Sequence, residues 1–175
     1  MRGDIPIFND YIKSKADYIT RRFETRNPFE IAKWLGIEIL FRNDFTELKG
    51  MYTVIKRKRF VFLNANLPEQ VQTVVCAHEL GHDALHRHIA VNAAFQEFVL
   101  YDMRSRPEYE ATSFAAHMLL EDNDIFSLAG DGYDIVQIAQ KMNTDINLML
   151  IKMHEMNRAG CKFNIPYLPP SDFLK

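Results

Sequence analysis

The chain is poor in cysteine, in net charge and in long apolar runs, and each shortage argues against a class of protein. Its 175 residues hold two cysteines, Cys76 and Cys161, which are far apart and form no C-x-x-C motif. We therefore expect reduced, buried thiols and no disulfide framework. The formal net charge of −2 gives no general attraction to nucleic acid or to an anionic membrane.

An apolar segment long enough for a membrane span or a secretory signal is also missing. No stretch approaches about 18 consecutive apolar residues, and Met1–Asp4 leads into no signal-like run. Hydrophobic residues at 47% and charged residues at 25% are ordinary for a globular protein. No internal repeat is visible. We expect a single domain over 1–175 that stays in the cytoplasm.

Helical and strand patterns alternate with clear start and stop signals. Asn27–Pro28 starts a short helix that Gly36 ends, Asn66 caps a later helix that carries the motif described below, and Thr144 caps the last helix. The expected helices cover about 10–26, 28–35, 67–86, 106–120, 134–142 and 145–158, and the expected strands cover 37–41, 51–55 and 60–63.

One motif, H-E-x-x-H at His78–His82, predicts chemistry rather than shape. Residues four apart on a helix lie side by side, so the His78 and His82 imidazoles can share one tetrahedral metal ion, for which zinc is the usual choice. Glu79 lies beside them, where a carboxylate can deprotonate a water molecule at the metal. Both histidines continue the apolar face of the helix, where unpaired imidazoles would be costly. The motif indicates a zinc hydrolase, most simply a peptidase.

A catalytic zinc site needs a third protein ligand, and the sequence offers several. Glu108 shares a helical face with small residues that would let its helix approach the histidine helix. It could instead serve only as the last residue of a capping box that begins at Ser105. Glu110 competes from a more exposed face. His88 fits less well, because Leu85 favours a continuing helix rather than a turn back to the metal. His86 fits less well because three ligands in a row along a straight helix cannot converge on one tetrahedral ion.

The chain resembles the ImmA/IrrE family of zinc metallo-endopeptidases. The resemblance rests on A-H-E-L-G-H at 77–82 together with E-Y-E-A-T-S-F-A-A-H-M-L-L at 108–120. The family pattern in the second motif is similar to E-x-x-A-N-x-F-A-A-x-L-L-M-P. Thr112 stands where the family usually has Asn or Asp, and Glu121–Asp122 replaces the usual Met-Pro. The likeness covers roughly residues 25–160.

The resemblance implies zinc ligands at His78, His82 and Glu108, with Glu79 as the catalytic acid and base. It also implies an anti-repressor that cleaves a helix-turn-helix repressor of a mobile element or prophage. The expected fold is α+β, a zincin-like metallopeptidase domain that is mostly helical with a small antiparallel sheet before the H-E-x-x-H helix. The expected parts are a catalytic core at about 28–125, C-terminal helices at 134–158 and an extended proline-rich tail at 163–175.

Several accessory roles are left open by the sequence. A second donor to the oxyanion is expected, with three candidates, and a carboxylate such as Asp83 should orient the imidazoles. The candidates are Tyr101, Tyr109 and His117. A substrate peptide could add as a strand to the edge of 60–63.

Two alternatives compete with the peptidase. The chain could be a regulatory protein without enzymatic activity that sequesters a repressor, with zinc structural or absent. Residues 134–158 could form a helix-turn-helix, but only Lys152 and Arg158 supply cations in its second helix, and its apolar residues look like core. The cations of Lys56–Arg59 are more simply a solvated hairpin tip. We therefore expect neither direct nucleic-acid binding nor a membrane partner.

Overall fold

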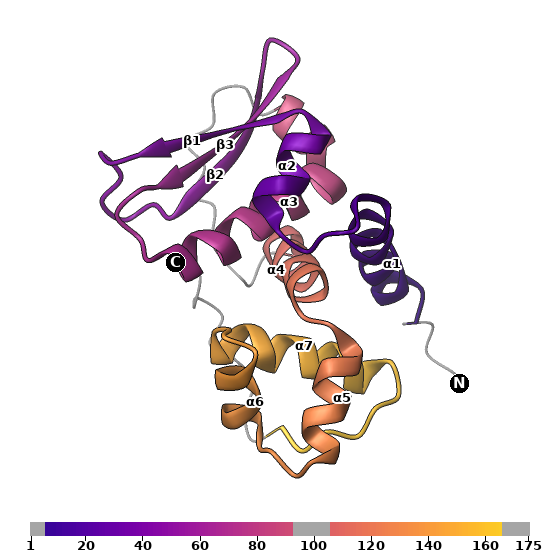
Figure 1. The fold of residues 1–175 in the computed structure, drawn as a ribbon. Helices are drawn as coiled ribbons and strands as arrows, with labels where there is room; N and C mark the ends of the chain where they lie inside the picture. Colours follow the sequence, from indigo (N-terminus) through magenta and orange to yellow (C-terminus); the bar gives the residue numbers. More distant parts are fainter. Residues whose placement is uncertain (1–5, 93–105, 166–175) are drawn as a thin grey trace.

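A computed structural model of the chain describes residues 6–92 and 106–165. Within these residues, helices predominate, and a small three-stranded sheet comes between α2 and α3 in chain order (Figure 1). The helices are α1 (Pro6–Phe23), α2 (Pro28–Leu35), α3 (Glu69–Asn92), α4 (Arg106–Leu119), α5 (Asp122–Gly130), α6 (Ile135–Lys141) and α7 (Ile146–Arg158). The strands are β1 (Ile37–Arg42), β2 (Gly50–Ile55) and β3 (Lys58–Asn64). The expected α+β class is confirmed.

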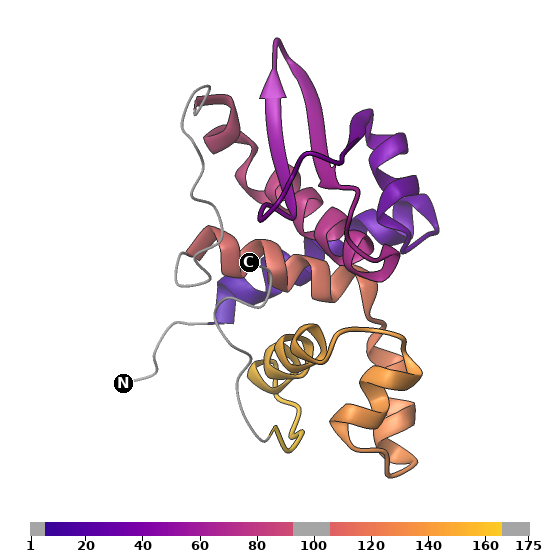
Figure 2. The ribbon, with the colours of Figure 1, turned by 90° about the vertical axis from the view of Figure 1, so that its left-hand side faces the viewer.

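The elements stack in the order sheet, α3, α4 and C-terminal helices. The sheet lies over α3, and α3 crosses α4, which in turn contacts α1 and α7 (Figures 1 and 2). A single cluster of buried apolar side chains runs through these layers, from Val61 in the sheet to Phe114 in α4 and Met149 in α7. The two helices that carry the motifs, α3 and α4, therefore lie in the middle of the fold.

The sheet is mixed, which corrects the expectation of an antiparallel sheet. Its strand order is β1-β3-β2. The β2–β3 pair is antiparallel, as the hairpin pattern predicts, but β1 pairs with β3 in parallel. The central strand β3 is thus paired along both edges. Addition of a peptide to 60–63 was a wrong prediction, because the edges of this sheet are β1 and β2.

The hairpin turns on Lys56 and Arg57, two residues with positive φ of 49° and 68°. This is the handedness that a two-residue turn between twisted strands requires. The four cations do not form one basic patch, because Lys58 and Arg59 belong to β3 and Arg59 pairs with the buried Asp83 at 3.0 Å. A solvated hairpin tip accounts for the remaining cations.

Capping residues decide where the helices begin, and two of our expectations about them were wrong. The α2 boundaries are confirmed, since Asn27 accepts a hydrogen bond from the Phe29 amide and Gly36 ends the helix at φ 69°. Asn66 does not cap α3, because the helix begins three residues later, at Glu69, and the Asn66 side-chain amide donates instead to the carbonyl of Asn43. The cap of α7 is Asp145, which accepts from the Asn147 amide, not Thr144.

Helix α5 was absent from the sequence prediction. It begins directly after α4, at Asp122. The tail expected at 163–175 lies mostly outside the described residues, but its start is held in place. The side-chain amide of Asn157 donates to the Phe163 carbonyl oxygen and accepts from the Phe163 backbone amide. The Phe163 ring stacks on Phe126 with centroids 5.6 Å apart.

The centre of the fold depends on a glycine. A Cβ atom at Gly81 of α3 would lie 2.9 Å from both the Cα and the carbonyl oxygen of Ala111 in α4. Only a residue without a side chain allows this approach of two backbones. The small side chain expected on the Glu108 face is confirmed at Ala111, and Gly81 makes room for α4.

The surface carries an aromatic pair at the junction of α1 and α2. Trp34 is 70% exposed, and its ring stacks on Phe23 with centroids 6.5 Å apart and planes 10° apart. Cys76 is buried, Cys161 is half-buried, and both are free thiols, in agreement with the expected absence of a disulfide framework. In the described part of the chain, no helix has both the length and the apolarity of a membrane span.

The helix-turn-helix alternative is not supported by the burial of α7. Lys152, one of the two cations on which it depends, is 1% exposed and bonds Asp122 of α5. Met149, Leu150 and Met153 are buried as core residues. A recognition helix needs exposed groups that reach base edges or phosphates, and this helix has one of its two cations turned inward.

Candidate metal and peptidase site

Helix α3 presents the two motif histidines to the same point. His78 and His82 are 1% and 8% exposed, and their rings meet edge to face with centroids 4.8 Å apart. Their Nε2 atoms are 3.1 Å apart. Two imidazole nitrogens in such proximity repel each other unless a proton or a cation lies between them.

Helix α4 brings Glu108 to that same point. Its Oε2 lies 3.2 Å from His78 Nε2, and its Oε1 lies 3.4 Å from His82 Nε2. The Oε1 atom is buried and, apart from this 3.4 Å contact, has no hydrogen-bond partner among the described residues. Ligand atoms of these three residues all lie within 4.8 Å of one another, and all three residues are buried.

These three residues fit a zinc ion. With bonds of about 2.0–2.1 Å, the ligand atoms of a tetrahedral site are about 3.3 Å apart. The two Nε2 atoms are 3.1 Å apart, and the contacts of 3.2 Å from His78 to Oε2 and of 3.4 Å from His82 to Oε1 are close to that edge length, with a different carboxylate oxygen facing each imidazole. Two neutral imidazoles and one carboxylate are also a donor set that catalytic zinc sites use. The orphaned Oε1 of Glu108 would gain a partner.

The remaining ring nitrogen of His78 contacts α4. His78 Nδ1 is 3.1 Å from Thr112 Oγ1, and that hydroxyl donates to the Glu108 carbonyl oxygen at 2.9 Å. Because its proton is used in this way, the Thr112 oxygen is left to accept from a protonated Nδ1. In that tautomer His78 Nε2 carries a lone pair, as a metal ligand must.

His82 has the equivalent support from a second polar chain. Its Nδ1 is 3.2 Å from His86 Nδ1, and His86 Nε2 is 2.9 Å from Glu110 Oε2. Arg106 donates to the other oxygen of Glu110 at 2.6 Å. If His86 donates from Nε2 to the carboxylate, its Nδ1 must accept, so His82 is protonated at Nδ1. Both motif histidines thus turn a lone pair toward Glu108.

Glu108 is held in its ionised form. Burial alone would raise the pKa of this carboxyl, but the adjacent His78 and His82 imidazoles, when they carry a proton at Nε2, outweigh burial and hold the pKa at about 2. At neutral pH the residue is a carboxylate, which is the form that binds a cation.

Glu79 lies next to this cluster but outside it, on the side of the sheet. Its side chain is 1% exposed. A Cβ atom at Gly50, the first residue of β2, would lie 3.1 Å from Glu79 Oε1 and 2.4 Å from Val75 Cγ1. The missing side chain at Gly50 therefore leaves room for the Glu79 carboxylate beside the edge strand β2.

Three other sequence candidates for metal ligation are not part of the cluster. Glu110 bonds His86 and Arg106, so it supports His82 indirectly. His86 lies at a kink in α3, with φ −125°, and contacts His82 by Nδ1. His88 is exposed on the last turns of α3. The spacing of four residues in His82–His86 and in Glu108–Thr112 could have indicated both supporting residues, but we interpreted neither in that way.

Asp83 does not orient the imidazoles. It accepts hydrogen bonds from the Tyr52 hydroxyl at 2.6 Å and from Arg59 and Arg87 at 3.0 and 2.8 Å. This buried carboxylate instead ties α3 to β2 and β3. In part because of Asp83, the pKa of Tyr52 is raised; burial of the phenol is the larger cause.

The candidate oxyanion donors point elsewhere or lie outside the described residues. The Tyr109 hydroxyl donates to Glu155 of α7. His117 Nδ1 contacts Lys152 Nζ at 3.0 Å, and burial lowers the pKa of this histidine to about 3. Tyr101 lies in the segment 93–105, which the structure does not describe. Neither Tyr109 nor His117 faces the clustered residues.

Comparison with known families identifies the family of the chain. The family model of the IrrE N-terminal-like domain, peptidase family M78, matches residues 32–154, which include every clustered residue. The chain belongs to the ImmA/IrrE family. The resemblance found in the two motifs is thereby confirmed, and the family is one of metallopeptidases.

Two relatives of this ImmA/IrrE chain come from a phage and a bacterium. It is 35% identical over 112 residues to uncharacterized immunity region protein 2 of Bacillus phage phi105, which covers 63% of the chain and 69% of the relative. It is 30% identical over 115 residues to metallopeptidase ImmA of Bacillus subtilis (strain 168), which covers 63% of the chain and 64% of the relative. The match spans about two thirds of each relative.

Replacing His86 with Ala should lower the affinity for Zn²⁺ by about 10- to 100-fold, the usual loss when the hydrogen-bond partner of a ligating histidine is removed. The acceptor for His82 Nδ1, now 3.2 Å away, would be lost. His86→Asn should retain most of the affinity, since the amide oxygen can replace Nδ1 as acceptor. Competition with a chromophoric chelator measures the affinity. The exposed His88→Ala is the control, and equal affinity in His86→Ala and His88→Ala would contradict the role.

Proposed function

We propose that the chain is a zinc-dependent endopeptidase with His78, His82 and Glu108 as metal ligands and Glu79 as the catalytic acid and base. The single observation that carries the proposal is the convergence of three buried ligand groups from two helices, with an orphaned carboxylate oxygen among them. The family supports the same reading. In this proposal, residues 28–125 are the catalytic core of one domain.

Each residue has a distinct task in the proposed hydrolysis. Zinc, when bound, would polarise the scissile carbonyl and acidify a water molecule. Glu79 would take the proton of that water and later give it to the leaving amine. Because it lies beside Gly50, the carboxylate would be close to a peptide laid along β2. Thr112 and His86 would keep the two imidazoles in the ligating tautomer.

We propose a protein substrate, a helix-turn-helix repressor of a mobile element or prophage, which would make the chain an anti-repressor. Support comes from the relatives, one of which is named for a phage immunity region and the other as a metallopeptidase. The competing function is sequestration of a repressor without cleavage. It requires neither the water activation nor Glu79, so the two functions predict different products.

Zinc stoichiometry tests the site. Elemental analysis of the purified protein should give about one zinc per chain, and Glu108→Ala should give clearly less, because two imidazoles alone hold the ion weakly. Glu110→Ala is the matched control on the same helix and should keep its zinc in excess metal. One zinc in both wild type and Glu108→Ala would contradict the ligand assignment. No zinc in folded wild type after reconstitution would favour the sequestering protein.

Cleavage tests the activity. The zinc-loaded chain is incubated with helix-turn-helix repressors from the same genome, and fragments are identified by mass spectrometry. The expected result is one cleaved repressor with a defined new terminus, which a chelator prevents. A repressor that binds the zinc-loaded chain and stays intact would support sequestration.

A further inference from the structure

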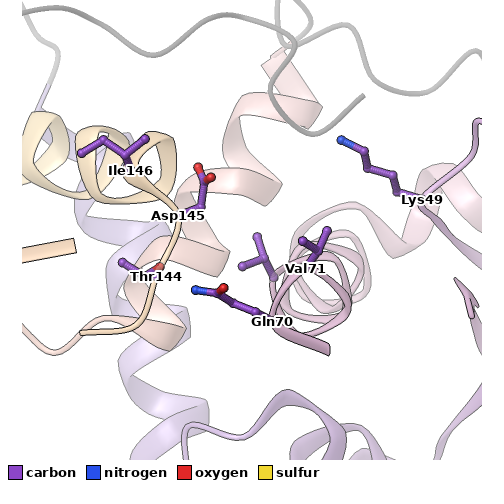
Figure 3. Close-up of a pocket in the computed structure, with 7 residues that line it drawn as sticks. Lys49, Gln70, Val71, Thr144, Asp145 and Ile146 are labelled. Carbon is purple, nitrogen blue, oxygen red and sulfur yellow. The ribbon is translucent and has the colours of Figure 1, made fainter. Parts of the chain in front are cut away.

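A hollow of about 310 Å³ lies between the first turns of α3, the N-terminus of α7 and the start of β2 (Figure 3). Its lining residues are Lys49, Gln70, Val71, Val74, Thr144, Asp145 and Ile146. None of them belongs to the metal cluster. The volume lies at the small end of the range for ligand pockets, which suits one large side chain better than a folded partner.

The hollow and the proposed site lie on the same face of α3. At 100° per residue, Val71 points in a direction about 20° from His78 and midway between His78 and His82. Val74 lies one turn before His78. At 1.5 Å per residue, Val74 and Val71 are about 6 and 10 Å, respectively, from His78 along the helix axis.

Strand β2 also connects the two places. Lys49, on the rim of the hollow, immediately precedes Gly50, whose missing Cβ makes the space for Glu79. An extended peptide advances about 3.3 Å per residue. A peptide that crosses the metal cluster along α3 and the start of β2 would therefore place a side chain in the hollow two or three residues from the reacting bond.

The lining specifies the chemistry of that side chain. Val71, Val74 and Ile146 offer apolar surface, while Lys49 and Asp145 stand on opposite sides of the hollow (Figure 3). The walls are preformed, since Asp145 caps α7 through the Asn147 amide and Gln70 bonds the Asn143 carbonyl at 2.7 Å. An apolar side chain would be buried below, and the flanking peptide groups would meet polar atoms at the rim.

We propose that this hollow is a specificity subsite, which receives a large apolar side chain of the substrate two or three residues from the cleaved bond. The inference rests on the proposed peptidase function, but it can be tested by binding alone. It assigns substrate selection to residues of α3 and α7 that no catalytic step requires.

The probes are peptidyl hydroxamates, whose hydroxamate group binds a zinc ion. The peptide extends from that group in either chain direction, and the second and third residues from it are Ala or Leu. Calorimetry with the zinc-loaded protein should show that Leu at one of these positions binds about 10-fold tighter than Ala. Val71→Phe, which fills the hollow, should abolish that gain while zinc content and circular dichroism stay unchanged. Val136→Phe, the same substitution at an exposed position of α6, should keep the gain.

Cleavage-site profiling on a proteome-derived peptide library separates failure of the subsite from failure of the function. Cleavage with a large apolar preference that Val71→Phe removes supports both. Cleavage whose residue preferences are the same in wild type and Val71→Phe overturns the subsite and leaves the peptidase standing. A Leu-dependent gain in hydroxamate binding without any cleavage supports the subsite and contradicts the activity. If the protein shows no cleavage and no Leu-dependent gain in hydroxamate binding, both the subsite and the peptidase function are overturned.

Discussion

Glu79→Gln should lower kcat/KM for peptide hydrolysis by about 10²- to 10⁴-fold while the chain keeps its zinc. The amide fills the same buried space beside Gly50 but cannot take a proton from water. The clustered metal-binding residues do not include Glu79, so metal content should not change. The rate of cleavage of a repressor, or of a peptide whose cleavage hydroxamates inhibit, gives kcat/KM, and elemental analysis of the same samples gives the zinc content.

The matched control is Glu69→Gln, the same substitution on the first turn of α3 at an exposed position. It should leave both rate and zinc content unchanged. Unimpaired turnover in Glu79→Gln would remove the catalytic role. Parallel loss of zinc and activity in Glu79→Gln would instead make Glu79 a residue that holds the site together.

Asp122→Ala should destabilise the fold by about 3 kcal/mol, whereas Lys152→Met should cost only about 1 kcal/mol. Lys152 Nζ is buried and bonds Asp122 Oδ1 at 2.5 Å and His117 Nδ1 at 3.0 Å. Without Asp122 its charge is stranded in the core. Without Lys152, Asp122 still has Lys13 at 3.2 Å and is partly exposed to water. Burial already lowers the pKa of Lys152, although Asp122 opposes this.

Urea unfolding followed by circular dichroism measures these free energies, and the double variant provides the control. Asp122→Ala/Lys152→Met should be about as stable as Lys152→Met alone, because no charge remains to be stranded. Equal losses in the two single variants, or additive losses in the double variant, would show that burial of the ammonium is not the cause.

Local rules were enough to predict the parts of the site that lie within one helix. The spacing of His78 and His82 places both on the inward face of α3 whatever the rest of the fold does. The stripe that contains Glu108 likewise follows from helical periodicity, and small residues on it predicted a close approach to α3. The structure has that approach at Gly81 and Ala111.

Features that depend on how elements cross were beyond those rules. Thr112 meets His78 only because α4 crosses α3 at one particular angle and height. The parallel pairing of β1 with β3 has no local signal, since a strand pattern does not say which neighbour it joins. Asp83 was a candidate to orient an imidazole, but its partners are Tyr52 and Arg59 of the sheet and Arg87 of α3.

In the C-terminal half the prediction failed for a different reason, because a charged side chain was assumed to be exposed. Charged residues are rarely buried unless paired, so Lys152 on α7 was counted as a surface cation. Its partner Asp122 begins α5, a helix that the sequence prediction missed because of the acidic run from Glu121 to Asp124. Neither the helix nor the pairing could be inferred without knowing that α5 returns to α7.

The stack of Trp34 on Phe23 determines what an optical experiment on this protein can report. Trp34 is the chain's one tryptophan, and it already faces water in the folded state. Unfolding the core would therefore shift its emission wavelength little, so fluorescence is a poor gauge of global stability. Because the ring rests on α1 from its place in α2, changes in its emission intensity would instead follow the contact between those two helices.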